Sequence, residues 1–395
     1  MPSDRVRSLR PTAVNSILAE VRKLQAEGVQ LVSLMRGEPD LPTPPHIVDA
    51  AKQALDKGRT GYPDNRGEMK LREAAAAKLA RDNGVAYDPA SEILITTGAT
   101  FGIYAALTAV LNPGDEVLLP EPIYDAYHSP VALSGGVVRT IPCGIRDGRF
   151  TLDIADLEAA CSPRTRALLL NTPWNPTGTV FTREELEAIG HFVCARGLML
   201  LSDEIYETIL YGDAKHVCLA ALSPELRHRT IILNSLSKTY SMTGWRTGYC
   251  AAKREWIDAM FLVLQQSSRG PATFIQDAAA VALAGSQQCV AEMRAEYTRR
   301  RERVCEVLAQ VQGPRVLAPE GGFFAMVDVR GCGLPSEEVR RRLMRDASVV
   351  VVHGSAYGPS GEGTLRVSFA SGGAILDEGL RRLAAGLTRI FEEQT

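Results

Sequence analysis

The sequence has no long run of apolar residues and none of the cysteine patterns of a metal or redox centre. No apolar run reaches the ~18 residues of a membrane-spanning helix, and the N-terminal segment has no apolar signal region. The eight cysteines are scattered, without a CxxC pair or a Cys/His cluster, which gives no support to a zinc site or a redox dithiol. We therefore expect a cytoplasmic protein without bound metal or membrane contact, whose cysteines are small buried side chains.

The sequence also lacks an excess of either charge, because 44 Lys and Arg face 46 Asp and Glu for a net charge of −2. That balance excludes the basic footprint of a protein that binds nucleic acid or an anionic membrane, so any anion site must be local. Lysine is scarce, with eight among the 44 basic residues. The length of 395 residues suffices for two or three domains of roughly 150 residues each.

Short apolar runs alternate with helical patterns through the middle of the chain. Runs of this kind, without apolar–polar alternation, are typical of strands buried on both faces. They are Ile93–Thr96, Val117–Leu119, Ala167–Leu170, Leu198–Leu201, Ile231–Leu233 and Gly248–Ala251. Helical patterns such as Phe101–Leu111 and Arg183–Ala195 separate them, and Thr182 with Glu185 forms the pattern of a capping box. This order predicts an α/β fold with a doubly wound, mostly parallel sheet.

The two ends of the chain have a different pattern. We expect an amphipathic helix at 13–27 and a long helix rich in Arg and Glu at 285–311. Apolar stretches, a strand and two further helices follow, at Gly322–Val329, Ser336–Asp346, Ser348–Val352, Leu365–Phe369 and from Asp377 onward. The pattern predicts a small α+β domain formed by both termini, residues 1–47 and 288–395, beside a large α/β domain of residues 48–287.

Polar motifs follow four of the predicted strands directly. They are Thr97–Thr100, Asn171–Gly178, Asp203–Tyr206 and Ser235–Lys238. In an open α/β sheet the ligand binds beyond the carboxyl ends of the strands. Because the topology brings these motifs to one edge of the sheet, they predict one shared site.

Lys238 is the lysine that this site singles out, because it follows a buried strand among hydroxyl side chains. Burial of an ammonium group is costly unless the group is neutralised or used. Schiff-base formation uses it, since burial and nearby cations lower the pKa of the amine and make it nucleophilic. The alternative is a lysine that stays charged and binds a phosphate or a carboxylate.

The segment Gly98-Ala99-Thr100 opens a helix directly after a strand, where free N–H groups and the helix dipole bind phosphate. Ser235, Ser237 and Arg246 can add hydroxyl donors and a charged fork to that site. Alone, this is a weak signal, because every strand–helix turn has a helix N-terminus. The alternative for Arg246 is a surface ion pair.

Four further side chains are candidates for chemistry. Asp203 follows a buried strand and needs a cation, such as a protonated cofactor ring nitrogen, and Tyr206 is close enough in sequence to bind the same ring. The alternative is an N-cap Asp with a packing Tyr. Asn175 is held between prolines, which is also an ordinary turn pattern. Arg366, flanked by apolar residues, suits a substrate carboxylate or an internal salt bridge.

Taken together, the motifs resemble the class I/II aminotransferases, a family of fold-type-I pyridoxal-phosphate enzymes, and most closely their aspartate-aminotransferase-like branch. The matching segments occur in the family's order and spacing over nearly the whole chain. They are GEPDLPTP at 37–44, GYPDNRG at 61–67, NPTG at 175–178, DEIY at 203–206 and SLSKTYSMTGWRTGY at 235–249. One such motif is moderate evidence, and the ordered set is very specific.

The resemblance implies transamination between an L-amino acid and a 2-oxo acid by a ping-pong mechanism, with pyridoxal 5'-phosphate held as a Schiff base on Lys238. It also implies that Asp203 pairs with the pyridine nitrogen, that Tyr206 and Asn175 bind the phenolic oxygen, and that Tyr124 stacks on the ring. Phosphate contacts fall to Gly98, Ala99, Thr100, Ser235, Ser237 and Arg246. Tyr62 would reach the phosphate of a neighbouring subunit, which implies a homodimer with shared sites. The substrate carboxylate falls to Arg366, Asn175 and the backbone of Gly37.

The sequence departs from the family pattern at two places. The phosphate turn reads Gly98-Ala99-Thr100, where many relatives have a second glycine or a serine, and Ala99 still offers its N–H group. Arg36 stands before Gly37, where relatives commonly carry an apolar residue near the substrate side chain. We hypothesise that Arg36 recognises an acidic substrate side chain. The alternative is an ion pair with a nearby acid or with the partner subunit.

Two other functions fit parts of the pattern. The same scaffold and the same three residues, Lys238, Asp203 and Arg366, also serve β-elimination at a C–S bond and other reactions of the cofactor. A cofactor-binding transcription regulator would need an added DNA-binding domain, and we expect no room for one in this chain. The near-neutral charge also disfavours a regulator. The preferred amino donor is left open by the sequence.

Overall fold

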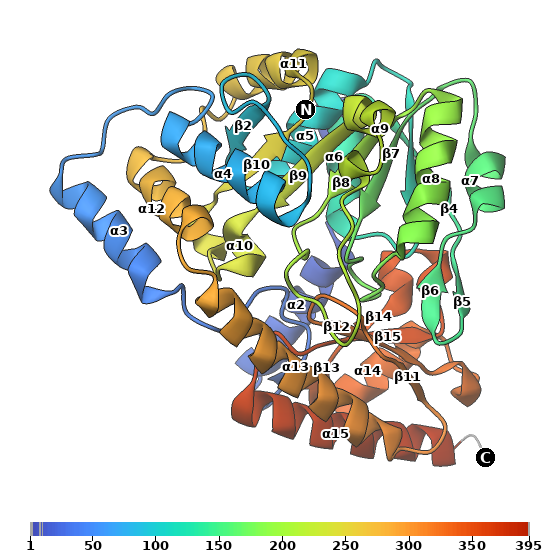
Figure 1. The fold of residues 1–395 in the computed structure, drawn as a ribbon. Coiled ribbons are helices and arrows are strands. Elements are labelled where there is room, and N and C mark those ends of the chain that lie inside the picture. Colours follow the sequence, from blue (N-terminus) through green and yellow to red (C-terminus); the bar gives the residue numbers. More distant parts are fainter. Residues whose placement is uncertain (1–2, 8, 10, 394–395) are drawn as a thin grey trace.

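The computed structural model of the chain describes residues 3–7, 9 and 11–393, and it contains two main sheets (Figure 1). The larger sheet has seven strands. In spatial order these are β2 (Ile93–Thr96), β10 (Gly248–Ala251), β9 (Thr230–Ser235), β8 (Met199–Asp203), β7 (Thr165–Asn171), β3 (Glu116–Pro120) and β4 (Val137–Ile141). Only β10 runs antiparallel to its neighbours. The prediction of a mostly parallel sheet is confirmed, and the six predicted apolar runs coincide with six of its strands, except that Leu198 lies just before β8.

Helices cover both faces of this sheet. Alternate residues of a strand point to opposite faces, and here both sets are apolar, so each face is buried under helices. Leu94, Leu201 and Leu233 pack on one face. The helices of that face are α5 (Ala99–Val110), α6 (His128–Leu133) and α11 (Arg254–Gln265). The neighbouring residues Ile93, Leu200 and Ile232 pack on the other face. Its helices are α3 (Pro45–Asp56), α4 (Met69–Asp82), α7 (Ile154–Ala160), α8 (Arg183–Arg196) and α12 (Thr273–Ala284).

The second main sheet is antiparallel and lies below the first in Figure 1. Its order is β11 (Arg315–Leu317), β12 (Phe324–Asp328), β15 (Thr364–Ser368) and β14 (Val352–His353). A parallel pair, β1 (Val32–Ser33) with β13 (Val349–Val350), joins the N-terminal segment to this part. The surrounding helices are α2 (Ala13–Ala26), α13 (Gln288–Ala309), α14 (Ser336–Asp346) and α15 (Gly373–Glu392). The remaining short elements are α1 (Asp4–Arg7), β5 (Gly144–Arg146), β6 (Arg149–Thr151), α9 (Pro224–Arg229) and α10 (Leu236–Thr239).

Side-chain caps mark the starts of helices α2, α8, α9 and α10. The capping box at the start of α8 is present, since the Thr182 hydroxyl accepts from the Glu185 N–H and the Glu185 carboxylate accepts from the Thr182 N–H. The final helix begins at Gly373 rather than at the predicted Asp377. The sequence favoured the later start because glycine is a poor helix former and Asp suits a first turn.

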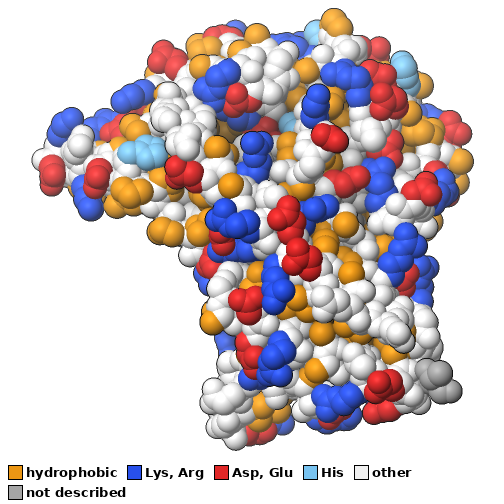
Figure 2. Space-filling view, turned by 60° about the horizontal axis from the view of Figure 1, so that its bottom comes forward, with side chains coloured by type: hydrophobic (Ala, Val, Ile, Leu, Met, Phe, Trp, Pro, Cys, Tyr) orange, Lys and Arg blue, Asp and Glu red, His pale blue; other side chains and the backbone are white. Residues whose placement is uncertain are grey.

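Neither the described helices nor the face shown in Figure 2 has a feature that points to a membrane span or to a highly charged partner. Among the described residues, no helix is long and apolar enough to cross a membrane. On the face in Figure 2, basic and acidic side chains are interspersed, without a large area of one sign. The division of the chain at residues 47 and 287 stays a prediction. What matters for the site is that segments from both main sheets meet at the carboxyl edge of the larger one.

Candidate active site

A cavity of about 1290 Å³ lies where the carboxyl edge of the seven-stranded sheet meets the small sheet. All of the predicted site residues line it except Gly98 and Tyr62. Those that do are Arg36, Gly37, Ala99, Thr100, Tyr124, Asn175, Asp203, Tyr206, Ser235, Ser237, Lys238, Arg246 and Arg366. Segments more than three hundred residues apart in sequence therefore meet at one site, as the strand topology predicts.

Lys238 lies at the centre of this cavity, on the short helix α10 that follows β9. Its Nζ donates a hydrogen bond to the carbonyl oxygen of Gly37 at 2.6 Å. Burial lowers the pKa of the amine to about 8, with Arg246 and Arg366 acting in the same direction against two nearby carboxylates. Within the described part of the chain, the amine forms no ion pair. Near neutral pH a useful fraction of it is an uncharged nucleophile.

Asp203 ends strand β8 and is buried. Its Oδ2 accepts a hydrogen bond from the Tyr127 hydroxyl at 2.6 Å, and its Oδ1 accepts the N–H of Ile205 at 3.2 Å. Burial raises the pKa of the carboxyl to about 6, while both hydrogen bonds oppose that rise. The turn at 204–208 is not helical, so the N-cap alternative is wrong. The carboxylate has two donors but no ion-pair partner in the part of the chain that the structure describes, which fits a protonated ring nitrogen.

Tyr206 and Asn175 stand beside Asp203 on the cavity wall. The Tyr206 ring is buried edge-on against Phe323 and Phe324, with ring centroids 5.5 and 6.2 Å away. The Oδ1 of Asn175 is buried without a hydrogen-bond partner among the described residues. A buried amide without a partner is costly, so a bound polar ligand fits this position. Asn171 orients the turn, since its Oδ1 accepts the Asn175 N–H at 2.7 Å.

The N-terminus of α5 and the turn after β9 form a polar cradle. Gly98 has φ 81°, and a Cβ there would lie 2.8 Å from Nη2 of Arg246. Glycine is thus required for the guanidinium of Arg246 to lie against this turn. Ser235 Oγ accepts the Ser237 N–H at 3.1 Å. Arg246 donates to the carbonyl of Thr243 at 3.0 Å and forms no ion pair with a described carboxylate, contrary to the surface-pair alternative. Hydroxyls, free N–H groups and an unpaired guanidinium fit a phosphate.

Arg366, from the small sheet, is buried on the opposite side of the cavity. Its guanidinium lies 4.2 Å from the ring centroid of Phe324 and 5.1 Å from that of Tyr357. Nη2 donates to the Met35 carbonyl at 3.1 Å, and Nε has no partner among the described atoms. The predicted alternative, an internal salt bridge, is absent from the described residues. A buried guanidinium with free donors fits a ligand carboxylate.

Two predicted residues have surroundings that differ from those of the others. Arg36 lines the cavity, but its Nη2 lies 3.3 Å from Oε1 of Glu38, and both side chains are about half exposed. The ion pair foreseen as the alternative is therefore present. Tyr62 is 88% exposed and lies outside the cavity, with the guanidinium of Arg269 5.7 Å from its ring.

Tyr127 is the site residue that the sequence analysis missed. It ends the 3₁₀ turn Asp125–Tyr127, and its ring meets that of Tyr124 edge-on at 5.3 Å. The spacing of two tyrosines three residues apart was visible in the sequence. Nothing in the sequence, however, showed that the second hydroxyl reaches a carboxylate 76 residues away.

Comparisons with known proteins agree with this geometry. The family model described as aminotransferase class I and II matches residues 29–384. The chain is 41% identical to an aromatic-amino-acid aminotransferase of Thermococcus litoralis over 96% of this chain and 97% of that one. It is 38% identical to an aspartate aminotransferase of Geobacillus stearothermophilus, again over 96% and 97%. The crystal structure of an aspartate aminotransferase from Rhizobium meliloti superposes with a TM-score of 0.95, at 35% identity over 98% and 99% of the two chains.

The chain belongs to the class I and II aminotransferases. Its fold is the fold-type-I α/β fold of this family, and its reaction is transamination between an amino acid and a 2-oxo acid, similar to that of aspartate aminotransferases.

Proposed function

We propose that the cavity binds pyridoxal 5'-phosphate, attached covalently to the Lys238 amine, and that the residues assigned above act on this cofactor and on the substrate. The carrying observation is the combination of three side chains on one cavity. Lys238 has an amine with a pKa of about 8, and neither the buried acid Asp203 nor the buried cation Arg366 has an ion-pair partner among the described residues. Each is costly alone, and a ring nitrogen and a substrate carboxylate satisfy the last two.

When bound, the cofactor supplies an electron sink for the charge left on the substrate Cα. In this proposal Asp203 holds the ring nitrogen in its protonated form, and Tyr206 and Asn175 donate to the phenolic oxygen. Once the substrate amino group has taken its place on the cofactor, the free Lys238 amine would remove the proton from the substrate Cα and deliver it to the cofactor carbon to which the amine had been attached. Tyr124 packs on the ring face.

The remaining residues bind and orient. Arg366, with Asn175 and the Gly37 backbone, fixes the substrate carboxylate so that the Cα–H bond faces Lys238. The cradle of Gly98, Ala99, Thr100, Ser235, Ser237 and Arg246 holds the phosphate. These groups line one cavity. The amino acid and the oxo acid would therefore bind at the same site in turn, which supports a ping-pong cycle.

The oligomeric state and the cellular location of the protein are also proposed. We propose a homodimer with shared sites, in which Tyr62 of each chain reaches the phosphate of the other. Its exposure of 88% outside its own cavity supports a role beyond its own chain. We also propose a cytoplasmic location, which agrees with eight free cysteines in the described chain.

The half-reaction tests the proposed function. Purified protein is mixed with single L-amino acids in the absence of any oxo acid, and the visible spectrum of the cofactor is followed. Conversion of the bound aldehyde form to the amine form is the expected result. A yellow protein that releases ammonia or a keto product without that conversion would instead support β-elimination or oxidation.

We further propose that Arg36 recognises the side chain of an acidic donor, aspartate or glutamate. It lines the cavity, and its pair with Glu38 is half exposed and therefore weak enough to exchange for a substrate carboxylate. We expect Arg36→Ala to raise the KM for aspartate about tenfold, the effect of ~1.4 kcal/mol, and to leave alanine unaffected. Arg254→Ala, which breaks an exposed pair with Asp258, is the matched control. If Arg36→Ala leaves the kinetic constants for aspartate and glutamate unchanged, Arg36 does not recognise the acidic side chain.

A further inference from the structure

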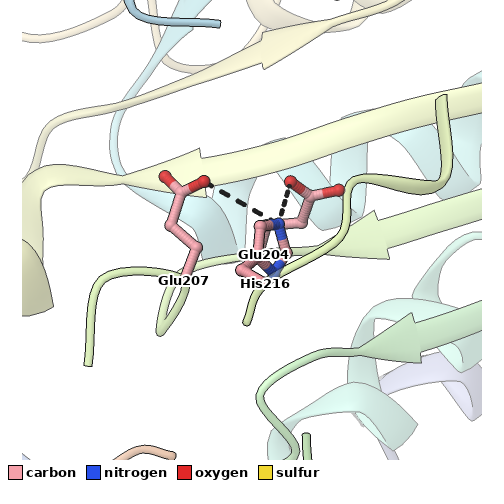
Figure 3. Close-up of side chains that lie close together, drawn as sticks. All are labelled: Glu204, Glu207 and His216. Atoms are coloured by element: carbon pink, nitrogen blue, oxygen red, sulfur yellow. Dashed lines mark hydrogen bonds and ion pairs between the residues drawn. The ribbon is translucent and has the colours of Figure 1, made fainter. Parts of the chain in front are cut away.

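A group of charged and polar side chains is buried behind the active site. Figure 3 shows its centre, where His216 lies between Glu204 and Glu207. Nε2 of His216 is 2.9 Å from Oε2 of Glu204 and 3.9 Å from Oε2 of Glu207. Lys78, Asn83 and Asn234 complete the group. We call these six residues the buried network.

Two carboxylates and an imidazole are ligand types for a metal, but their oxygens are already engaged. Glu207 accepts from Lys78 Nζ, from Asn234 Nδ2 at 2.6 Å and from Asn83 Nδ2 at 2.7 Å. Glu204 accepts from Asn83 Nδ2 at 3.1 Å and from His216, and its other oxygen accepts from the Ser202 hydroxyl at 2.9 Å. A metal ion would have to displace Nδ2 of Asn83, which donates to Oε2 of both Glu204 and Glu207. The described contacts therefore form an ionic and hydrogen-bonded network rather than a metal site, although Nδ1 of His216 is buried without a partner among the described residues.

Strand alternation places this network opposite the cofactor cavity. Asp203 lines the cavity, and the next residue, Glu204, belongs to the network. Ser235 lines the cavity, and the preceding residue, Asn234, belongs to the network. Since neighbouring residues of a strand point to opposite faces, the two strands that carry the acid and the phosphate turn present the network on their reverse side.

Hydrogen bonds connect the network to the backbone that carries Lys238. The amide of Asn234 is fixed at both ends, because its Nδ2 donates to Glu207 and its Oδ1 accepts the N–H of Ser235 at 2.7 Å. The hydroxyls of Thr208 and Thr239 are 3.0 Å apart. Thr208 follows Glu207 and Thr239 follows Lys238, so this bond ties the turn that carries Glu207 to the helix that carries Lys238.

The network also pairs opposite charges. Burial works against an ionised Glu207, but Lys78 and His216 outweigh it and lower the pKa of this carboxyl. Burial likewise works against a charged His216, but Glu204 raises the pKa of the imidazole. Two carboxylates thus face an ammonium group and an imidazole. The other titratable groups facing them stay neutral, because burial raises the pKa values of Tyr87, Cys218 and Tyr249.

We propose that the residues of the buried network are positioning residues for the cofactor site: they hold Ser235 and Lys238 in place, and Lys78 balances the carboxylate of Glu207 on the reverse side of Asp203. This inference rests on the proposed attachment of pyridoxal phosphate to Lys238. It assigns to Lys78, Glu207 and Asn234 an effect on the cofactor without any contact with it.

Charge-changing variants test the electrostatic part. We expect Lys78→Met to leave one negative charge uncompensated, to favour the protonated form of the nitrogen that joins Lys238 to the cofactor, and to raise the pH midpoint of the cofactor's colour change. Glu207→Gln should lower that midpoint, and the double variant should return it close to the wild-type value. A shift of roughly one pH unit is expected for one uncompensated charge in the protein interior at an effective dielectric of ~20.

An uncharged variant tests the positioning part. Asn234→Leu removes the hydrogen bonds to Ser235 and to Glu207 without changing the formal charge. We therefore expect about a tenfold weaker binding of pyridoxal phosphate to the apoprotein, the effect of losing the bond that fixes Ser235, and a midpoint that stays close to the wild-type value. Glu116→Gln is the matched control for Glu207→Gln. Glu116 is also a buried carboxylate, but it is bound to Ser162 and Arg164 at the amino end of β3, away from the site.

The spectrum of the wild-type protein distinguishes a failure of the proposed function from a failure of the network proposal. A wild-type protein that forms no coloured complex with pyridoxal phosphate contradicts the proposed function itself. A coloured wild type whose folded Lys78, Glu207 and Asn234 variants keep its midpoint and its cofactor affinity overturns the inference about the network. Should Lys78→Met not fold, the more conservative Lys78→Gln removes the same ammonium charge, and the same upward shift is expected.

Discussion

Asp203 is the residue whose chemistry depends most on a single neighbour. It is buried beside another acid, Glu204, and these surroundings favour its neutral form. The hydroxyl of Tyr127, 2.6 Å away, opposes that tendency. With a pKa of about 6, the carboxylate is charged at neutral pH and loses its charge as the pH falls below about 6. Its capacity to hold a protonated ring nitrogen falls over the same interval.

We therefore expect Tyr127→Phe to shift this limit. Loss of the donor raises the pKa of Asp203, so the acid limb of cofactor binding should move to higher pH by about one unit, and kcat should fall about tenfold to a hundredfold, the effect of a hydrogen bond to a charged group. The measurement is the pH profile of cofactor affinity together with that of kcat. Tyr240→Phe, which removes a bond to Gln287 outside the cavity, is the control. Identical profiles for both variants would contradict the role of Tyr127.

At the scale of elements, the sequence predicted what local patterns encode. Buried strands such as β2 and β10 were placed correctly because their residues are apolar on both faces. Strand β4 was missed because it is an edge strand whose residues at 137–140 are largely exposed, so it has no apolar run. The antiparallel direction of β10 was equally invisible, since a direction is fixed by the connections and not by composition.

The site was predictable to the same extent. Motifs at strand ends were placed on one cavity because the parallel topology demands it. The contacts that tune them were not predictable, since Tyr127–Asp203 and Lys78–Glu207 join residues far apart in sequence. Whether Arg36 binds Glu38 or a substrate depends on side-chain packing, which no periodicity reports.

The start of helix α5 depends on Gly98. Gly98 combines a φ of 81° with a Cβ position only 2.8 Å from Arg246. We expect Gly98→Ala to displace the guanidinium and to weaken cofactor binding by the apoprotein about tenfold to a hundredfold, from backbone strain of ~1 kcal/mol or more and the loss of a phosphate contact. Gly58→Ala, with φ 71° and nothing within 4 Å of its Cβ, imposes the backbone strain alone. Equal losses of cofactor affinity in the two variants would argue against the cradle.

At the scale of the whole molecule, the question is whether one chain completes its own site. The cavity of a single chain contains the lysine, the acid and the arginine but not Tyr62, which lies outside it and is 88% exposed. A two-fold dimer would supply the same residue twice, each to the other chain, because its interface is the same patch on both copies.

Mixed dimers decide this directly. We expect Tyr62→Ala and Lys238→Ala each to be strongly impaired, and a co-refolded mixture of the two to regain activity. In a hybrid dimer one site would combine the intact Lys238 of one chain with the intact Tyr62 of the other, while the second site would carry both substitutions. With random pairing, half of the dimers are hybrids with one good site each, so about a quarter of the wild-type activity should return. If Tyr62 instead served its own chain, every site in the mixture would be defective, and no activity beyond the average of the two parents would appear.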